Sequence, residues 1–435
     1  MSIADSSASC AFTITRPTLT LLFIATLAAC GGGGGGGGDG TAPSGSPAPV
    51  ASTPSPTPPP APVSGTLCDS ASGRVLEVGP GKPYASPNAA SRAAVSGDVI
   101  RISAGDYRGA AALATWSASN LTICGTGGRA RLFADGLNQS GKGIWVVAGT
   151  NIAIDNLEFR GATVPDQNGA GIRAEHGGEL RIANSGFYDN ENGLLAAAGA
   201  STITIDRSEF ARNGRGDGYT HNLYVNAIDR LTVRSSFFRE ARVGHNLKSR
   251  ARETVIEHSY FMDGTAGTAS YQADFPNGGR VVMRGNLLQK GPSAQNANLI
   301  SYGNEGLSNS VRTLELYHNT LVNTRSGGAW LSLPSGVSTV RLTANLLAGT
   351  GNQALTTNGF PSGSVLQTAN VTGLASNIPG ATNLNAPNFW PDATLQAQIG
   401  LAGVPDAAYT QDAPQPYTLR NLGAGRVAGA VQSAP

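Results

Sequence analysis

The strongest constraint on the fold of this chain is a pattern that recurs every 23 to 33 residues over its middle part. Each copy reads apolar-x-apolar, two variable residues, a small polar residue, one further residue and then Phe or Leu. The last position is occupied in turn by Phe159, Phe187, Phe210, Phe238, Phe261, Leu288, Leu321 and Leu347. Coils of this length, with several short strands and no helical period, are typical of a solenoid of parallel strands. We therefore predict an all-β fold.

A second column of the repeat holds small polar residues, two positions before the Phe or Leu of every copy from Phe187 onward. Its members are Ser185, Ser208, Ser236, Ser259, Asn286, Asn319 and Asn345. Stacked at one bend, such side chains can hydrogen-bond from coil to coil. With this ladder, residues 70–350 resemble the right-handed parallel β-helix proteins of the pectin-lyase-like superfamily, and residues 87–96 resemble their short N-terminal cap helix. The resemblance implies a right-handed parallel β-helix solenoid but no single activity, because the superfamily includes lyases, hydrolases, epimerases and non-catalytic adhesins.

The residues before the repeat indicate export and lipid anchoring. Residues 19–29, LTLLFIATLAA, form an apolar run of signal-peptide length that follows Arg16. The run ends in Leu-Ala-Ala-Cys, which resembles a bacterial lipobox whose Cys30 becomes lipid-modified. We predict a lipoprotein signal peptide over residues 1–29 and a Gly/Pro-rich tether over residues 30–65.

The predicted location is the bacterial cell envelope. The outer membrane is favoured because Gly31 follows Cys30 where inner-membrane retention signals carry Asp, and the lipid anchor is the only predicted membrane contact. Cys68 and Cys124 would then lie in an oxidising compartment, where a disulfide could pin the first ordered segment to the fold. The sequence leaves this bond open, because it does not show the Cα separation that a disulfide requires.

The exported part divides in two by its pattern. Residues 66–350 are predicted to form the β-helix with its cap, and residues 351–435, which lose the period, a C-terminal capping segment. Within that segment, residues 388–390 and 417–419 look like strands that fold back over the end of the solenoid. Such a cover is needed because an open end would expose a row of strand edges.

Charge is scarce in this chain and unevenly placed. Charged residues make up 13% of the sequence and the net charge is +2, which excludes a broadly basic protein that coats nucleic acid. We therefore predict no nucleic-acid partner. Residues 207–252, however, hold ten basic and four acidic residues, a local net charge of +6. The predicted partner of this region is an anionic polysaccharide.

A second strand in each coil gathers these charges on one face. The strands align on an apolar core column that contains Ile172, Leu194, Leu223 and Leu247. Side chains alternate between faces and neighbouring coils lie about 4.8 Å apart, so the intervening side chains form one outward patch. This predicted patch contains Tyr224, Lys248, Arg250, Gln272 and Asp274. Further predicted substrate-binding residues are Arg173, Asn226 and Arg252.

The residue types in the patch suit β-elimination on a uronic-acid polysaccharide. In that reaction an enzyme must neutralise a carboxylate and place a base against the weakly acidic proton at C5. Arg250 can bind the carboxylate through two hydrogen bonds, and Lys248 beside it is the predicted base. Tyr224, or failing that His245 or His221 at the edge of the patch, is the predicted donor of a proton to the leaving oxygen.

Two other functions stay open at this point. A glycoside hydrolase needs two carboxyl groups about 5 to 9.5 Å apart, and only a loop residue such as Asp217 could complete a pair with Asp274. A non-catalytic polysaccharide-binding or structural lipoprotein needs no such pair. No metal site and no cofactor are predicted, because no cluster of acidic residues falls on adjacent coils. Calcium, which takes about six to eight oxygen ligands, is the alternative.

Overall fold

The computed structural model describes residues 66–175, 177–357, 359–400, 410–411, 419–420 and 427–431. The predicted signal peptide, the predicted lipidation site Cys30 and the tether up to residue 65 lie outside these ranges, as do most of residues 401–435. In the ranges that are described, no helix is long and apolar enough to cross a membrane.

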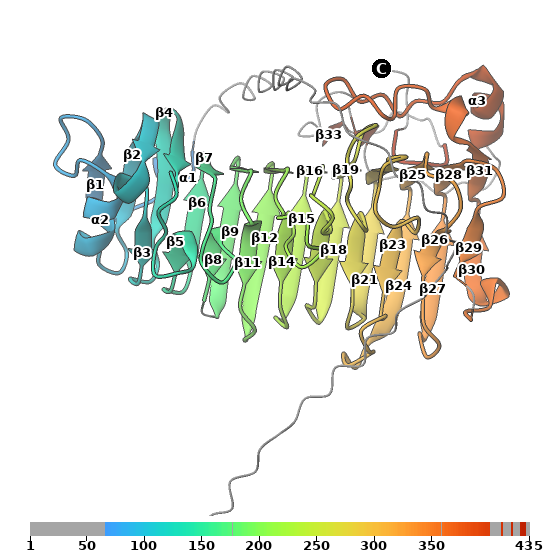
Figure 1. Cartoon of the computed structure of the whole chain (residues 1–435), viewed down its shortest axis with the longest axis horizontal. Helices are drawn as coiled ribbons and strands as arrows, with labels where there is room; N and C mark the ends of the chain where they lie inside the picture. Colours follow the sequence, from blue (N-terminus) through green and yellow to red (C-terminus); the bar gives the residue numbers. More distant parts are fainter. Residues whose placement is uncertain are drawn as a thin grey trace, which may run out of the picture. The chain divides into compact units, whose positions relative to one another are not determined.

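The described chain is an all-β solenoid of about 11 turns, in which strands pair in parallel with the equivalent strands of the neighbouring coils. Figure 1 shows the coils stacked in chain order from β2 to β30. The predicted fold class is therefore confirmed. One short pair near the C-terminus, β32 (Thr410–Gln411) and β33 (Leu419–Arg420), is antiparallel and lies outside the coils.

Each complete coil contributes one strand to each of three ladders. The first ladder contains β1 (Val75–Val78), β2 (Val99–Arg108), β4 (Thr122–Phe133), β6 (Ile152–Asp155), β9 (Gly178–Ala183), β12 (Ser201–Asp206), β15 (Arg230–Arg234), β18 (Glu253–Glu257), β21 (Gly279–Arg284), β24 (Arg312–Tyr317), β27 (Thr339–Thr343) and β30 (Val365–Thr368). The second ladder contains β7 (Leu157–Arg160), β10 (Gly186–Tyr188), β13 (Glu209–Ala211), β16 (Phe237–Arg239), β19 (Tyr260–Met262), β22 (Leu287–Lys290), β25 (Thr320–Asn323), β28 (Leu346–Gly349) and β31 (Val371–Leu374). The third ladder contains β3 (Ala114–Trp116), β5 (Gly143–Val147), β8 (Ala170–Ala174), β11 (Asn192–Ala196), β14 (Leu223–Val225), β17 (Leu247–Ser249), β20 (Ala273–Phe275), β23 (Ile300–Tyr302), β26 (Ala329–Ser332) and β29 (Ala354–Thr356).

The register of the second ladder confirms the alignment of the repeat. The Phe and Leu positions of successive coils pair directly, for example Phe187 with Phe210 and Phe261 with Leu288. From Phe159 to Phe261 the rings stack inside the solenoid with their centroids 4.4 to 5.1 Å apart. The core is thus a column of like side chains, each buried by the coils before and after it.

The column of small polar residues also forms the predicted ladder at one bend. The backbone N–H of Ser208 donates to Ser236 Oγ at 3.1 Å, and the backbone N–H of Asn286 donates to Asn319 Oδ1 at 2.9 Å. Each bend leaves an N–H without a strand partner, so the side chain of the next coil satisfies a group that would otherwise be buried and unpaired.

The predicted cap helix is α2 (Pro87–Ala93), near the N-terminal end of the stack. Ser86 Oγ accepts a hydrogen bond from the Ala89 N–H, and Pro87 occupies the first helical turn, where its missing N–H costs nothing. The helix is three residues shorter than predicted, because Asp98 Oδ2 accepts from the Val95 N–H at 2.7 Å and turns the chain towards β2.

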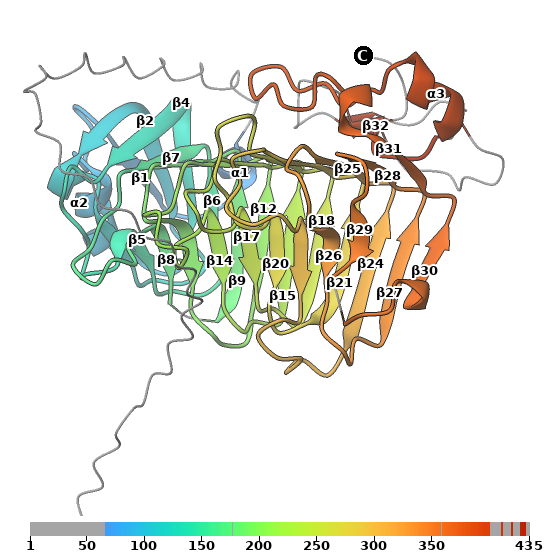
Figure 2. The same cartoon turned by 45° about the vertical axis from the view of Figure 1, so that its right-hand side comes forward.

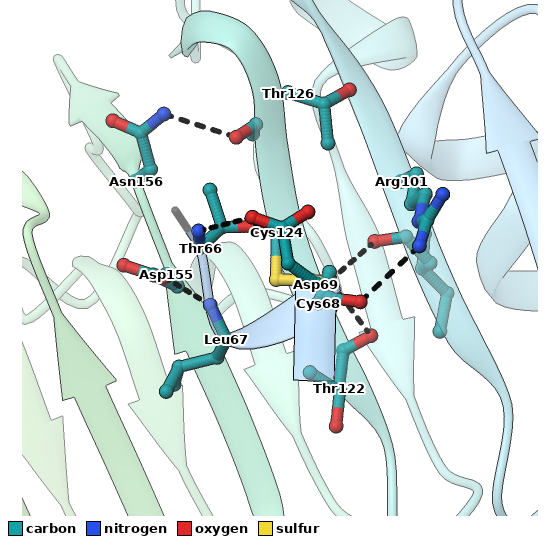
Figure 3. Close-up of a disulfide and its surroundings, with 12 residues drawn as sticks. Thr66, Leu67, Cys68, Asp69, Arg101, Thr122, Cys124, Thr126, Asp155 and Asn156 are labelled. Atoms are coloured by element: carbon teal, nitrogen blue, oxygen red, sulfur yellow. Dashed lines mark hydrogen bonds between the residues drawn. A yellow bond between two sulfur atoms is a disulfide. The ribbon is translucent and has the colours of Figure 1, made fainter. Parts of the chain in front are cut away.

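Cys68 and Cys124 form the disulfide that the sequence left open (Figure 3). Their Cα atoms lie 6.0 Å apart, and the bond joins the short helix α1 (Leu67–Ser70) to β4 across 56 residues of sequence. Two hydrogen bonds hold the same helix: the Leu67 N–H donates to Asp155 Oδ2 at 2.7 Å, and Arg101 Nη2 donates to the Cys68 carbonyl at 3.2 Å. The first described residues are therefore fastened to the first ladder.

The coils continue beyond residue 350, where the pattern was predicted to end. Val365 pairs with Val340 in the first ladder, and Asn370 extends the bend column from Asn345. The sequence pattern does not reveal this coil, because Thr372 instead of Phe or Leu takes the position equivalent to Leu347. The later segment around α3 (Ala393–Ile399) packs against the outer side of the second ladder.

The segment predicted as a strand over residues 388–390 forms no strand. It holds its place through the side chain of Phe389, which is fully buried in an apolar cluster with Tyr260 and Val322. The other predicted strand, over residues 417–419, lies mostly outside the described residues; Leu419 begins β33.

Replacing one ring of the core column should destabilise the whole stack. We expect Phe210→Ala to lower the free energy of unfolding by about 3 to 5 kcal/mol, because it leaves a cavity between two stacked rings. Denaturant unfolding followed by circular dichroism measures the change. Tyr219→Ala, at a side chain that is 85% exposed, is the control and should change the unfolding midpoint little. Equal effects of the two substitutions would contradict the stacked-column description.

Candidate active site

One column of outward side chains on the third ladder carries the candidate site. Its central members are paired directly across neighbouring strands: Tyr224 on β14 with Lys248 on β17, and Lys248 with Asp274 on β20. Figure 2 shows these three strands side by side. The sequence alignment predicted that Tyr224, Lys248 and Asp274 share a patch, and the structure brings them together. Asp274 lies directly beside Lys248, whereas the alignment predicted it beside Arg250.

Gln272 was predicted in the outward patch, and this placement is wrong. The register pairs Ala273 with Leu247, where the sequence alignment had Tyr271, so β20 is shifted by two residues and begins only at Ala273. A shift of two residues keeps Asp274 on the outward face but moves Gln272 off the strand, to the corner position that Asn222 and Asn246 hold in the preceding coils. Gln272 is consequently fully buried, where it accepts a hydrogen bond from Asn246 Nδ2 at 2.6 Å and donates one to Asp263 Oδ2 at 2.7 Å.

The centre of the site is a cluster of two cations around one carboxylate, that of Glu305. Lys248 Nζ donates to Glu305 Oε1 at 2.7 Å, and Arg250 Nη2 donates to Glu305 Oε2. A second carboxylate, Asp274 Oδ2, lies 3.6 Å from Lys248 Nζ. Arg250 is held further by donating from Nε to Tyr224 Oη at 2.9 Å and from Nη1 to Asn277 Oδ1. Side chains of three neighbouring strands and of the segments that follow β17, β20 and β23 thus meet at a single charged centre.

The two carboxyl groups of the cluster differ in their acidity. Burial raises the pKa of Asp274 to about 6, although the Lys248 ammonium opposes the shift. Partial burial would also raise the pKa of Glu305, but hydrogen bonds from Lys248 and Arg250 outweigh it and lower that pKa below the usual value. Near neutral pH Glu305 is therefore fully ionised, whereas Asp274 is a carboxylate that takes up a proton more readily.

His221 and His245 stack at the edge of the site, with their ring centroids 4.6 Å apart. Each uses Nδ1 to accept a backbone hydrogen bond: His221 from the N–H of His245 at 3.0 Å, and His245 from the N–H of Tyr271 at 3.3 Å. The remaining proton of each neutral ring must then lie on Nε2. For His245 this atom lies 3.5 Å from Asp274 Oδ2, so the ring can donate to that carboxylate.

Both imidazoles are neutral at physiological pH. Burial, together with the charges of Lys248 and Lys290, lowers the pKa of His245 to about 3. Burial likewise lowers the pKa of His221 well below its usual value, with the neighbouring His245, Lys248 and Arg250 adding to the shift. A neutral ring with Nδ1 engaged is a poor proton source, so the geometry favours Tyr224 over the two histidines as the proton donor.

A chain of buried amides runs beneath the site and fixes the corner that precedes its strands. Each member donates to the next, in the order Asn190, Asn213, Asn222, Asn246, Gln272 and Asp263. Asn222 and Asn246 immediately precede β14 and β17, which carry Tyr224 and Lys248. Because every link is a hydrogen bond between buried groups, the corner has one favoured arrangement.

Three residues predicted to bind substrate lie outside the charged cluster. Arg173 is in the outward column, but Leu195 separates it from Tyr224, and its Nε lies 3.0 Å from Glu175 Oε1. Asn226 Oδ1 accepts from the next backbone N–H, that of Ala227. Arg252 is paired with Asp229 and its side chain is 75% exposed.

The sequence analysis missed Glu305 and Asn277. Both lie in loops, after β23 and β20, whose lengths the repeat does not determine, and the only signal in the sequence was the scarcity of acidic residues itself. The loop carboxylate considered instead, Asp217, accepts hydrogen bonds from the N–H groups of Tyr219 and Thr220 and so stabilises its own loop.

The donor set of the cluster does not resemble a metal site. Lys248 and Arg250 carry no lone pair for a metal while they are charged, and a cation would be repelled by both. Across the described ranges, no group of three or more His, Cys, Asp and Glu side chains lies close enough to hold a metal ion.

Comparisons with known proteins agree with the β-helix fold. The family described as a right-handed beta helix region matches residues 114–355, more than half of the chain. No curated protein matches the sequence. The crystal structure of a pectate lyase aligns with a TM-score of 0.53 and 15% identity over 84% of this chain and 98% of its own. That of an alginate lyase from Paenibacillus sp. str. FPU-7 aligns with a TM-score of 0.47 and 17% identity over 69% and 99%. At these identities the similarity shows the fold alone. That conclusion rests on the pectate lyase, whose TM-score is above 0.5.

Imidazole NMR can test the description of the two histidines. In 15N-detected spectra we expect His221 and His245 to stay in the neutral Nε2–H form well below pH 6.5, because burial opposes their charging. The unfolded chain takes up these protons near pH 6.5, whereas folded His245 does so only near pH 3. Lowering the pH from about 6.5 towards 3 should therefore lower the free energy of unfolding. A urea-unfolded sample is the control, and titration of either folded ring near pH 6.5 would contradict the assignment.

Proposed function

Because this chain belongs to the family of right-handed β-helix proteins and carries a paired cation site on one outward column, we propose that it is a polysaccharide lyase, or the mechanistically related C5 epimerase, acting on an anionic uronate-containing polysaccharide. A pectate lyase of the same fold is consistent with that substrate class. The alternative function, a protein that only binds such a polymer, would use the same cations without proton transfer.

The observation that carries the proposal is the way in which Lys248 and Arg250 hold one carboxylate by both of its oxygens. A uronate residue presents the same group, attached to C5. Contact with a guanidinium and an ammonium neutralises the negative charge that otherwise opposes loss of the C5 proton. A group that contacts one carboxylate oxygen also lies near the hydrogen on the adjacent carbon. The cation pair therefore suits binding and activation together.

The proposed steps assign one role to each side chain. Arg250, steadied by Tyr224 and Asn277, binds the carboxylate. Lys248 passes a proton to Asp274, 3.6 Å away, and the resulting amine removes the C5 proton. In a lyase the C4–O bond then breaks as the C4–C5 double bond forms, and Tyr224 protonates the leaving oxygen. In an epimerase a proton returns to C5 from the opposite face instead.

The acidity of Asp274 supports its part in this scheme. A carboxylate whose pKa is raised to about 6 by burial accepts a proton more readily than an ordinary one, yet it is still ionised at pH 7. His245 Nε2, 3.5 Å from the same oxygen, steadies the carboxylate without competing for the proton.

A glycoside hydrolase is less well supported, although the structure does bring two carboxylates near each other. Glu305 and Asp274 both contact Lys248 Nζ, at 2.7 Å and 3.6 Å. A hydrolase places the glycosidic bond between its two carboxyl groups. Here the ammonium of Lys248 already fills that space, and the Asp274 side chain is buried behind it.

We propose further that the chain acts at the bacterial cell surface or in the periplasm. Its support is the lipobox-like Leu-Ala-Ala-Cys at residues 27–30, with a lipid on Cys30 as the only membrane anchor. The tether of residues 30–65 would let the solenoid reach polymer outside the membrane.

The lyase proposal can be tested directly with polyuronates. We expect the purified protein to release products with the ultraviolet absorbance of a C4–C5 double bond from alginate, pectate or hyaluronate, or to invert C5 as seen by NMR. Lys248→Ala, Arg250→Ala and Tyr224→Phe should each lower kcat by about 10²- to 10⁴-fold, because each removes a group from the transition state.

The matched control for these variants is Arg131→Ala, because Arg131 on β4 is paired with Asp106 and lies outside the third ladder. It should keep kcat/KM within about twofold of the unsubstituted protein. Absence of both elimination and epimerisation on the whole panel, in a protein that still binds the polymers, would leave the binding-only function in place of the proposal.

The pH dependence of the reaction should report on Asp274. We expect kcat/KM to fall as the pH drops below about 6, because the protonated carboxyl can no longer accept a proton from Lys248. Asp274→Asn should lower kcat by about 10²-fold or more and remove this acidic limb. Asp135→Asn, at an exposed partner of Arg108, is the control and should keep the limb. An unchanged profile in Asp274→Asn would rule out the assigned role.

A further inference from the structure

The Glu305 carboxylate occupies the place where the proposed function puts the carboxylate of the substrate. Resting on that function, we propose that Glu305 is a side-chain gate: it holds the Lys248–Arg250 pair closed until the carboxylate of a uronate residue displaces it. The gate restricts the site to polymers that bring their own carboxylate.

The contacts of Glu305 are those expected of a substitute ligand. Its two oxygens are divided between Lys248 Nζ and Arg250 Nη2, as those of a uronate would be. Its side chain is 47% exposed, whereas those of Lys248 and Arg250 are only 11% and 19% exposed. An incoming polymer therefore meets Glu305 before it meets the cations.

The loop that carries Glu305 is anchored on both sides of it. Asn304 Nδ2 donates to Ser301 Oγ at 2.9 Å and to the Ser332 carbonyl at 3.0 Å, and Leu307 packs against the main apolar core. The Glu305 N–H itself donates to the Pro276 carbonyl at 3.1 Å. Because the backbone is fixed in this way, opening requires only rotation about the side-chain bonds of Glu305.

The exchange of one carboxylate for another explains how the gate selects. If Glu305 simply moved away, Arg250 would lose its only carboxylate partner in the cluster and Lys248 would keep Asp274 alone, which is unfavourable for cations of little exposure. A uronate replaces the lost charge and both hydrogen bonds at once. A neutral sugar replaces neither, so it cannot open the site at comparable concentration. The same pairing keeps Lys248 and Arg250 in position while no substrate is bound.

Binding measurements can isolate the gate from catalysis. Titration calorimetry with hexamers of galacturonate, mannuronate and glucuronate-containing hyaluronan would be carried out on full-length protein with Tyr224→Phe, to prevent turnover. We expect the added substitution Glu305→Gln to lower Kd for the uronate hexamer that binds best by roughly fivefold, the factor that a partly exposed ion pair contributes. Glu305→Ala should act in the same direction, and a neutral cellohexaose should bind none of these proteins tightly.

The matched control is Glu179→Gln, at a similarly exposed glutamate that lies near Arg181 outside the site and should leave Kd unchanged. An unchanged or higher Kd in both Glu305 variants, with the folded state verified by circular dichroism, would overturn the gate. The proposed lyase or epimerase function would not be affected by that result if the unsubstituted protein is active. A lowered Kd without elimination or epimerisation by the unsubstituted protein would uphold the gate and refute catalysis. No binding of any uronate hexamer to any variant would refute the gate together with its substrate class.

Discussion

The coil-to-coil register of the parallel strands is the constraint on which the rest of the molecule depends. The same register stacks Phe187 on Phe210 inside the solenoid and sets Tyr224 beside Lys248 outside it. Because side chains alternate between faces, a slip by one residue would turn core residues outward and site residues inward. Backbone hydrogen bonds, the bend ladder and the buried amide chain all oppose such a slip. The interactions that stabilise the scaffold therefore also set the spacing of the site.

The charged cluster shows how a protein with few charged residues can hold two cationic side chains that are largely buried. Lys248 and Arg250 each lie near a carboxylate, so neither is left as an uncompensated charge. The difference in exposure between Asp274 and Glu305 separates their acidities, upward for the buried group and downward for the group bonded to two cations. One environment thus supplies both a proton acceptor and a firm counter-ion, and an active site that transfers protons needs that division.

The contacts of Glu305 preorganise the two cations and at the same time block access to them. Glu305 keeps the two cations in a geometry suited to a carboxylate, and in doing so it fills the position that a ligand must take. A site built in this way favours ligands that can complete the exchange of charge over ligands that merely fit the surface. For a polymer with a carboxylate on each sugar, the exchange is available at every position along the chain.

The sequence by itself determined the solenoid, its core column, the bend ladder and the closeness of Tyr224, Lys248 and Arg250, because all of these follow from a period and from the alternation of side chains. Tertiary structure alone decided the register of β20, since Tyr271 and Ala273 offered two alternative core positions and only the contacts of Gln272 with Asn246 and Asp263 choose between them. It alone brought Glu305 to Lys248 across 57 residues, because the path of a loop depends on its anchors and not on a repeat. The neutral state of the histidines likewise depends on burial, a property of the packed protein that no pattern of residues expresses.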